Sequence, residues 1–211
     1  DVPIELLGPL GCGIQTGAGA VLNACKVRPG SSVAVIGAGA VGLSAVMAAR
    51  LAGATTVIAV DLLAERIALA RELGASRGFD ARAIDLARLG ELAGCAAGID
   101  YIIDTTGLAD VVNAAIAALA PRGEIALVGA YAPGTQVSAD TTLIMSAGRV
   151  IRGVVEGSAD PQAFIPELIA HYRAGSFPFD RLVRFFGFDD IAAAIEAGES
   201  GQVVKPVLRL I

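Results

Sequence analysis

The chain has 211 residues, of which 55% are hydrophobic and 18% charged, enough apolar surface to bury the core of one domain with flanking arms. A formal net charge of −5 without any run of Lys and Arg argues against nucleic acid or an anionic membrane as the partner. The apolar runs are short and broken by glycine, well below the roughly 20 residues that a membrane-spanning helix needs.

Cysteine and histidine usage narrows the possible chemistry. His171 is the only histidine, so a Ser-His-Asp site would have to use it, and a site with several histidines cannot be built. We expect His171 to be a surface residue at the end of an amphipathic helix. Cys12, Cys25 and Cys95 show no disulfide-framework spacing, which fits a reducing cytoplasm. No signal or transit peptide is visible, and because the chain begins at Asp1 in an apolar stretch we expect a piece of a longer protein.

From residue 32 onward, short apolar runs alternate with helical patterns, which is typical of βαβ units and a parallel sheet. The predicted strands are 32–36, 56–60, 76–79, 100–104, 124–128 and 150–155. The predicted helices are 41–52, 64–73, one within 83–93, and 110–119. Strands one, four and five are unbroken apolar runs, as expected of central strands covered on both faces. The pattern predicts an α/β Rossmann fold, a doubly wound six-stranded parallel sheet of order 3-2-1-4-5-6 with helices on both faces.

Two arms flank this core. We expect residues 1–30 to form a connecting arm with helical character at 14–27, and residues 31–156 to form the dinucleotide-binding core. Residues 157–211 should form a C-terminal arm, with a helix at 161–173, a loop at 177–179, a helix at 189–197 and a terminal strand at 203–210.

A glycine pattern joins the first predicted strand to the first helix of the core. In Gly37-Ala-Gly39-Ala-Val-Gly42, the first glycine can take the tight turn and the second leaves room for a pyrophosphate. The third lets helix and strand pack closely, and the helix N-terminus then offers free N–H groups to phosphates. The alternative interpretation is a turn that packs closely without any ligand.

An acidic residue at the end of the second strand completes the pattern. Asp61 lies about 20 positions further on, where a carboxylate can accept hydrogen bonds from the adenosine ribose. Its charge would repel a 2′-phosphate, so NAD is favoured over NADP. Arg66 lies nearby and can soften this discrimination.

Two later strand ends point to the same crevice, because ligands of open α/β sheets lie across the carboxyl ends of the strands. Thr105 and Thr106 follow the fourth strand and should lie toward the adenosine. Val128, Gly129 and Ala130 follow the fifth and should line the nicotinamide side.

The segment Leu7-Gly-Pro-Leu-Gly-Cys12-Gly-Ile-Gln-Thr16-Gly-Ala-Gly19 resembles the strip before the cofactor fold in zinc-dependent medium-chain (MDR) alcohol dehydrogenases. The aryl or benzyl alcohol dehydrogenase branch is the most similar. The likeness continues through residues 26–30, the glycine turn, residues 60–61, 71–75 and 199–208, and so covers essentially the whole chain. It implies that a GroES-like catalytic half lies outside this chain, joined to residues 1–30, and that residues 157–211 return toward it.

The resemblance also implies roles for single residues. In that family a cysteine at the position of Cys12 is the third protein ligand of the catalytic zinc, the other ligands coming from the upstream half. Without the family, Cys12 is a small residue in a glycine-rich turn. Cys25 and Cys95 are expected to be structural. Thr16 should lie near the nicotinamide and take part in catalysis.

Further cofactor contacts follow from the same resemblance. Val41 should pack by the nicotinamide end, and Leu62 and Arg66 should lie beside the adenosine ribose. Val155, with Glu156, should border the carboxamide. Lys205 stands where relatives often place an Arg on the pyrophosphate, although a solvated surface lysine is the alternative and a Lys offers only a point charge.

The leading hypothesis is the NAD(H)-binding half of a zinc-dependent enzyme that oxidises a primary alcohol, of the aryl or allylic kind, to an aldehyde by hydride transfer. The 211-residue chain alone should bind NAD weakly and catalyse nothing. Two alternatives stay open: a zinc-free quinone or enone reductase that uses NADPH, and a non-catalytic NAD-binding module. Cys12 and Asp61 speak against the first. Copies are expected to pair at a sheet edge, near 150–155 and the apolar stretch 141–145.

Overall fold

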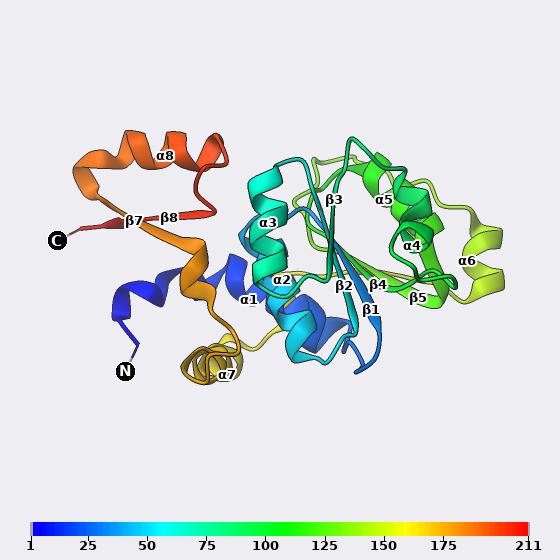
Figure 1. Cartoon of the computed structure of the whole chain (residues 1–211), viewed down its shortest axis with the longest axis horizontal. Coiled ribbons are helices and arrows are strands. Elements are labelled where there is room, and N and C mark those ends of the chain that lie inside the picture. Colours follow the sequence, from blue (N-terminus) through cyan, green and yellow to red (C-terminus); the bar gives the residue numbers. More distant parts are fainter. Residues whose placement is uncertain (1, 211) are drawn as a thin grey trace.

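The computed structural model describes residues 2–210 and confirms the predicted α/β fold. Six parallel strands form one sheet in the order β3-β2-β1-β4-β5-β6, as predicted (Figure 1). The first and last residues of the two predicted arms, Asp1 and Ile211, lie outside the described range. The strands are β1 (Ser32–Ile36), β2 (Thr56–Asp61), β3 (Arg77–Asp80), β4 (Ile99–Asp104), β5 (Leu119–Leu127) and β6 (Val150–Gly153).

Helices cover both faces of this sheet. The α-helices are α1 (Gly13–Gly19), α2 (Ala40–Leu51), α3 (Ala64–Glu72), α4 (Leu89–Leu92), α5 (Ala109–Ala118), α6 (Thr141–Ala147), α7 (Pro161–Arg173) and α8 (Ile191–Glu199). Shorter turns are η1 (Ile4–Leu6), η2 (Gly8–Gly11), η3 (Ala20–Ala24), η4 (Leu86–Arg88), η5 (Glu156–Ser158), η6 (Phe179–Leu182) and η7 (Phe188–Asp190). Within residues 2–210 none of the helices has the length and apolar character to cross a bilayer.

The core has two layers because side chains alternate along buried parallel strands. On β1, Val33 and Val35 face one layer, which is packed by α1, α2 and α7. Ala34 and Ile36 face the other layer, which is packed by α4 and α5. All five residues of β1 are buried, as the unbroken apolar run predicts.

Several predicted bounds shift, each for a local reason. β5 starts at Leu119, five residues earlier than predicted, because a register irregularity between Ile99 and Tyr101 lets residues 119–123 join the ladder. β6 ends at Gly153, so Val154 and Val155 leave the sheet earlier than expected. The helix expected within 83–93 is a 3₁₀ turn followed by one helical turn. The helix expected at 14–27 changes to π-helical geometry after Gly19.

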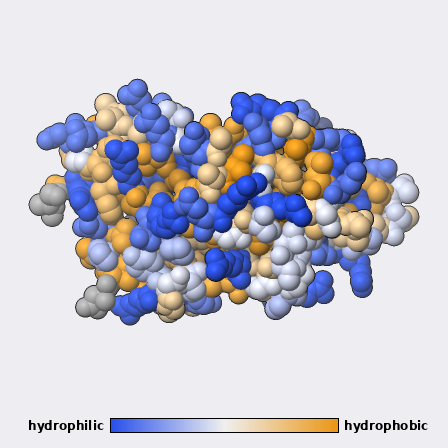
Figure 2. Space-filling model, in the orientation of Figure 1, coloured by the Kyte–Doolittle hydropathy of each residue, from blue (hydrophilic) through white to orange (hydrophobic). Residues whose placement is uncertain are grey.

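Two elements were not predicted. The helix α6 covers the apolar stretch that follows β5, and the strand β7 (Val183–Gly187) pairs in parallel with β8 (Lys205–Arg209). These two strands form a sheet of their own, beside α8 and at the end of the molecule that carries both chain ends (Figure 1). Hydrophobic residues reach the surface there between hydrophilic ones (Figure 2).

Helix α1 lies directly against α2, and glycines make this approach possible. A Cβ on Gly17 would lie 1.9 Å from the carbonyl oxygen of Val41. A Cβ on Gly13, in the same helix, would meet Val41 only at 3.6 Å, an ordinary contact. The N-terminal arm is therefore joined to the start of α2 by a backbone contact that tolerates no side chain at Gly17.

We expect Gly17→Ala to lower the free energy of unfolding by about 1–3 kcal/mol or more, because α1 must move away from α2. The matched variant Gly13→Ala should change it by at most about 1 kcal/mol, in the stabilising direction, through helix propensity. Urea unfolding of both variants measures the difference. Equal destabilisation by the two substitutions would contradict the contact.

Candidate functional site

The glycine pattern lies between β1 and α2, as predicted, and each glycine has a different reason to be there. Gly37 has φ +90°, and a Cβ on it would lie 2.4 Å from Oγ1 of Thr105. A Cβ on Gly42 would lie 1.8 Å from the carbonyl oxygen of Gly37. A Cβ on Gly39 would meet nothing within 4 Å. Close packing within the fold therefore requires glycine at positions 37 and 42. At Gly39 no packing contact requires it, and the space beside its Cα is open.

The open space lies at the N-terminus of α2. Gly39 is the N-cap residue, and it supplies no side chain to bond the first N–H groups of this 12-residue helix. Unpaired N–H groups and the helix dipole together attract anions. Val41, in the first turn of α2, is half-buried beneath α1.

Asp61 ties the end of β2 to the glycine turn. Its Oδ2 accepts a hydrogen bond from the N–H of Ala38 at 2.5 Å, and its Oδ1 accepts one from Leu63 at 2.9 Å. The next side chain, Leu62, is 53% exposed. The main-chain carbonyl of Leu62 accepts a hydrogen bond from Arg82, which is itself paired with Asp80.

An apolar slot of about 250 Å³ opens between the glycine turn and Asp61. Its wall is almost wholly apolar, and the Asp61 carboxylate lies at its rim. Sequence reasoning missed the contributions of Leu86, Leu108 and Val111. Leu108 could have been found from the sequence, because a large apolar residue in a loop is unusual. Its side chain is 58% exposed. The slot is lined by Ile36, Gly37, Val60, Asp61, Leu62, Ala81, Leu86, Thr106, Leu108 and Val111.

The loop after β4 is held by a buried carboxylate that the sequence did not single out. Asp104 is fully buried and accepts hydrogen bonds from Oγ1 of Thr106 at 2.7 Å and from the hydroxyl of Tyr131 at 2.5 Å. Burial, followed by the bond to Asp104, raises the pKa of Tyr131 well above its usual value. Thr105 donates to the carbonyl oxygens of Ile36 and Gly37. The hydrogen bonds of Thr105 and Thr106 therefore fix the loop after β4 against the glycine turn.

The loop after β5 packs against the loop after β4. A Cβ on Gly129 would lie 2.3 Å from the backbone nitrogen of Gly107. Val128 and Gly129 are half-exposed and Ala130 is exposed. The structure therefore brings these three residues to the same crevice edge as Thr105 and Thr106.

Arg66 binds the C-terminal arm just before Lys205. Arg66 is 8% exposed, and its Nη2 donates to the carbonyl of Val203 at 2.8 Å. Its Nη1 is buried and has no hydrogen-bond partner among residues 2–210. Burial lowers the pKa of Arg66, and the negative charge of Asp61 opposes that shift. Lys205, two residues after Val203, is half-exposed at the start of β8.

A second group of side chains gathers where α1 meets the η5 turn. The exposed thiol of Cys12 donates to Oε1 of Glu156 across 3.9 Å. Oγ1 of Thr16 and Nε2 of Gln15 each donate to Oε2 of Glu156 at 3.2 Å. Gln15 was not foreseen, since one amide in an apolar helix carries no signal by itself. Val155, also expected here, is 82% exposed.

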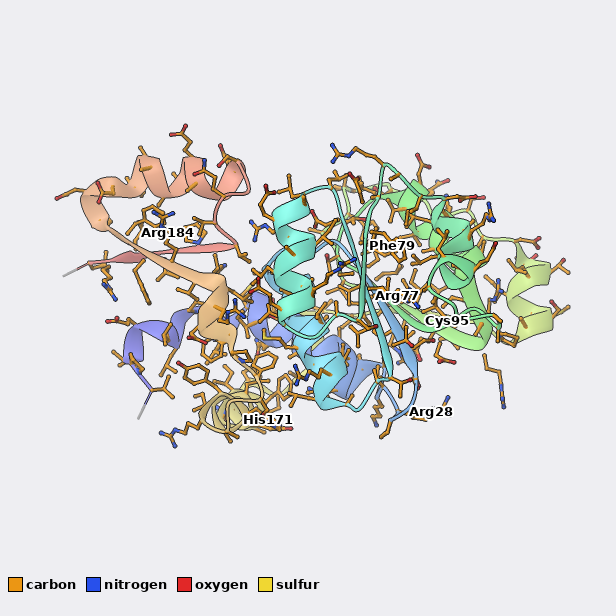
Figure 3. The ribbon with its side chains drawn as sticks, viewed as in Figure 1. Arg28, Arg77, Phe79, Cys95, His171 and Arg184 are labelled. Atoms are coloured by element: carbon orange, nitrogen blue, oxygen red, sulfur yellow. The ribbon has the colours of Figure 1, made fainter. Side chains whose placement is uncertain are left out.

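The other thiols and the histidine lie elsewhere. Figure 3 places Cys95 beside α4 and His171 on α7, well apart in the view. Cys25 is buried, and burial, reinforced by the charge of Glu124, raises the pKa of its thiol to about 12. No group of three or more His, Cys, Asp or Glu side chains in the described range could hold a metal ion. Any metal at Cys12 must therefore take further ligands from elsewhere.

Residues 40–171 match the family model described as zinc-binding dehydrogenase. The chain belongs to this family. It is 47% identical over 208 residues to geraniol dehydrogenase of Castellaniella defragrans, with 99% of the chain and 56% of that relative covered.

Solved structures agree with this family membership. Benzyl alcohol dehydrogenase from Acinetobacter calcoaceticus superposes with a TM-score of 0.96 at 46% identity, covering all of this chain and 58% of that one. An alcohol dehydrogenase zinc-binding domain protein from Burkholderia ambifaria gives 0.96 at 50% identity, covering all of this chain and 57% of that one. The chain thus matches the cofactor-binding half of zinc-dependent MDR dehydrogenases and spans 56–58% of the length of these three relatives.

We expect two of the three thiols of this chain, Cys12 and Cys25, to differ sharply in alkylation. At about pH 8, iodoacetamide should modify exposed Cys12 first, whereas Cys25 should react at least about a hundredfold more slowly, since its raised pKa leaves almost no thiolate. Peptide mass spectrometry over time gives both rates. Equal rates in the native chain would contradict the burial of Cys25, and denaturant should remove the difference.

Proposed function

We propose that this chain is the cofactor-binding half of a zinc-dependent, NAD-linked alcohol dehydrogenase. The single observation that carries the proposal is the open helix N-terminus at Gly39, flanked by an apolar slot with the Asp61 carboxylate at its rim. A dinucleotide has phosphates for the first and a flat base with a ribose for the second. Membership of the zinc-binding dehydrogenase family supports the same assignment.

The adenosine half of the cofactor is assigned to the slot. The adenine ring would lie between Leu62, Leu108 and their apolar neighbours, and the ribose hydroxyls would donate to Asp61. Each oxygen of Asp61 already accepts one backbone N–H and has a lone pair left for a hydroxyl. A 2′-phosphate would meet the charge of Asp61, which favours NAD over NADP.

The pyrophosphate is assigned to the glycine turn and the N-terminus of α2. The absence of a side chain at Gly39 lets the backbone approach the phosphates closely. Arg66 and Lys205 would complete the site from the adenosine side. The unpartnered Nη1 of Arg66 is a donor that a cofactor oxygen would satisfy.

The nicotinamide half then extends along the ends of β5 and β6. Val41, Thr16 and the three residues 128–130 would line the ring, and Val155 would cover it. The high exposure of Val155 supports this role, because an apolar side chain open to water is expected to gain a partner.

The catalytic zinc would be held by Cys12 together with ligands from the remaining part of the protein. The thiol is exposed at the turn into α1, within reach of such a part. Bound there, zinc would act as a Lewis acid on the oxygen of a small-molecule alcohol or aldehyde. We assign a primary alcohol of the aryl or allylic kind as substrate, by analogy with the relatives named for geraniol and benzyl alcohol.

The rest of the chain serves this arrangement. Residues 1–30 would lead from a GroES-like catalytic domain, residues 31–156 would be the NAD-binding core, and residues 157–211 would return toward that domain. The exposed edge of β6, with Val150 40% and Ile151 36% exposed, is assigned to pairing between copies. Three free cysteines in the chain fit a reducing cytoplasm.

The decisive experiment is calorimetric titration with NAD⁺ and NADP⁺. We expect NAD⁺ to bind the native chain more tightly, and Asp61→Ala to weaken NAD⁺ binding by at least about tenfold with little loss for NADP⁺. Asp189→Ala removes an equal charge from an exposed site outside the crevice and should change neither affinity. Tighter binding of NADP⁺ by the native protein, or an unchanged Asp61→Ala variant, would contradict the assignment.

The zinc assignment has its own test in the full-length protein. Cys12→Ser should lower the zinc affinity by at least about tenfold, because even residues that only orient zinc ligands contribute that much. Metal analysis after dialysis against a weak chelator measures the retained zinc. Cys95→Ser should retain the native content. Full retention of every zinc ion by Cys12→Ser would exclude Cys12 as a ligand.

A further inference from the structure

The η5 turn at the end of β6 presents Glu156 in an unusual backbone conformation. Glu156 has φ +47°, in the left-handed region that residues with a side chain rarely adopt, and Gly157 and Ser158 follow with φ +69° and +49°. Such conformations persist where the surrounding structure imposes them, and they gather at functional sites.

Close packing on α1 imposes this turn. A Cβ on Gly157 would lie 2.5 Å from the carbonyl oxygen of Gln15 and 2.8 Å from Cα of Gly19. The backbone on either side therefore cannot shift, and the Glu156 side chain is directed over the N-terminal end of α1.

Two neutral side chains hold the carboxylate in place. Thr16 and Gln15 both donate to Oε2, and Gln15 is 2% exposed and also donates to the carbonyl of Gly11 at 3.0 Å. Across residues 2–210 no Lys or Arg forms an ion pair with Glu156. Its negative charge is thus fixed in position and exposed, with no Lys or Arg of residues 2–210 paired to it.

The topology brings this charge to the nicotinamide end of the crevice. α1 packs on the first turn of α2 through Gly13 and Gly17, each of which faces Val41. With the adenosine in the slot beside β2 and the pyrophosphate at α2, the other half of a dinucleotide must run toward the ends of β5 and β6. Glu156 comes three residues after Gly153, the last residue of β6.

We propose that Glu156 selects the redox state of the cofactor: its carboxylate stabilises the cationic ring of NAD⁺ relative to the neutral ring of NADH. The inference rests on the proposed function. When the ring accepts a hydride at C4 it gains two electrons and one hydrogen and loses its positive charge, so the attraction to Glu156 disappears. Glu156 thus adds to the affinity for NAD⁺ and not to that for NADH, and so lowers the preference of the site for NADH. In a partly solvated crevice, one charge at a few ångströms changes relative affinity by about five- to tenfold.

The test measures dissociation constants of NAD⁺, NADH and ADP-ribose for the zinc-loaded, full-length protein and its variants. We expect Glu156→Gln to lower the ratio Kd(NADH)/Kd(NAD⁺) by about five- to tenfold while Kd(ADP-ribose) changes by less than about twofold. Glu156→Asp, which keeps the charge, should restore most of the ratio. Glu167→Gln, which removes an exposed carboxylate from α7, should leave all three constants unchanged.

The outcomes separate the two proposals. If Glu156→Gln changes all three dissociation constants by the same factor, Glu156 only supports the fold. If the ratio Kd(NADH)/Kd(NAD⁺) stays unchanged, the charge of Glu156 does not act on the nicotinamide ring. Either result overturns the inference and leaves the proposal of NAD binding intact. A wild-type protein that binds neither NAD⁺ nor ADP-ribose would overturn the proposed function, and the inference with it.

Discussion

The close contact between pieces of backbone at glycine is the constraint on which the rest of this structure depends. Gly17 lies against the carbonyl of Val41, Gly19 lies against Gly157, and Gly42 lies against Gly37. At each of these places a Cβ would overlap a backbone atom, so the approach is open only to glycine. Together the contacts bring α1, α2 and the η5 turn to one point, where Gln15 and Thr16 of α1 bond Glu156.

The electrostatic layout of the crevice follows from this arrangement. The N-terminus of α2, which attracts anions, lies between two carboxylates, Asp61 on one side and Glu156 on the other. Asp61 is held by backbone N–H groups, whereas Glu156 is held by side chains of α1. A dinucleotide matches this order, with hydroxyls at one end, phosphates in the middle and, when oxidised, a positive ring at the other.

The candidate cofactor crevice and the candidate metal ligand differ in how much of each site this chain supplies. Residues of this chain form both the apolar slot and the glycine turn. By contrast, no group of three or more His, Cys, Asp or Glu side chains among residues 2–210 could hold a metal ion, so Cys12 stands as a single candidate ligand. The sheet of β7 and β8, with exposed Phe188 and Ile195 nearby, carries apolar surface beside the N-terminal arm, where Arg209 pairs with Glu5. In the proposed enzyme, this chain would bind the cofactor, and the metal site would need ligands from another part of the protein.

The sequence by itself determined the features that depend on local pattern. Unbroken apolar runs separated by helical periods predicted the six strands and their order, and the spacing from Gly37 to Asp61 predicted which strand ends would form the crevice. Only the tertiary structure decided what depends on contacts between distant segments. Asp104 and Tyr131, Arg66 and Val203, and Glu156 with Thr16 are each separated by many residues along the chain. Such pairs leave no periodic signal, because burial and a hydrogen-bond partner, not spacing, give an isolated polar residue its role. The strand β7 was missed for the same reason: its partner β8 comes from beyond an intervening helix, and pairing with it, more than its own composition, makes it a strand.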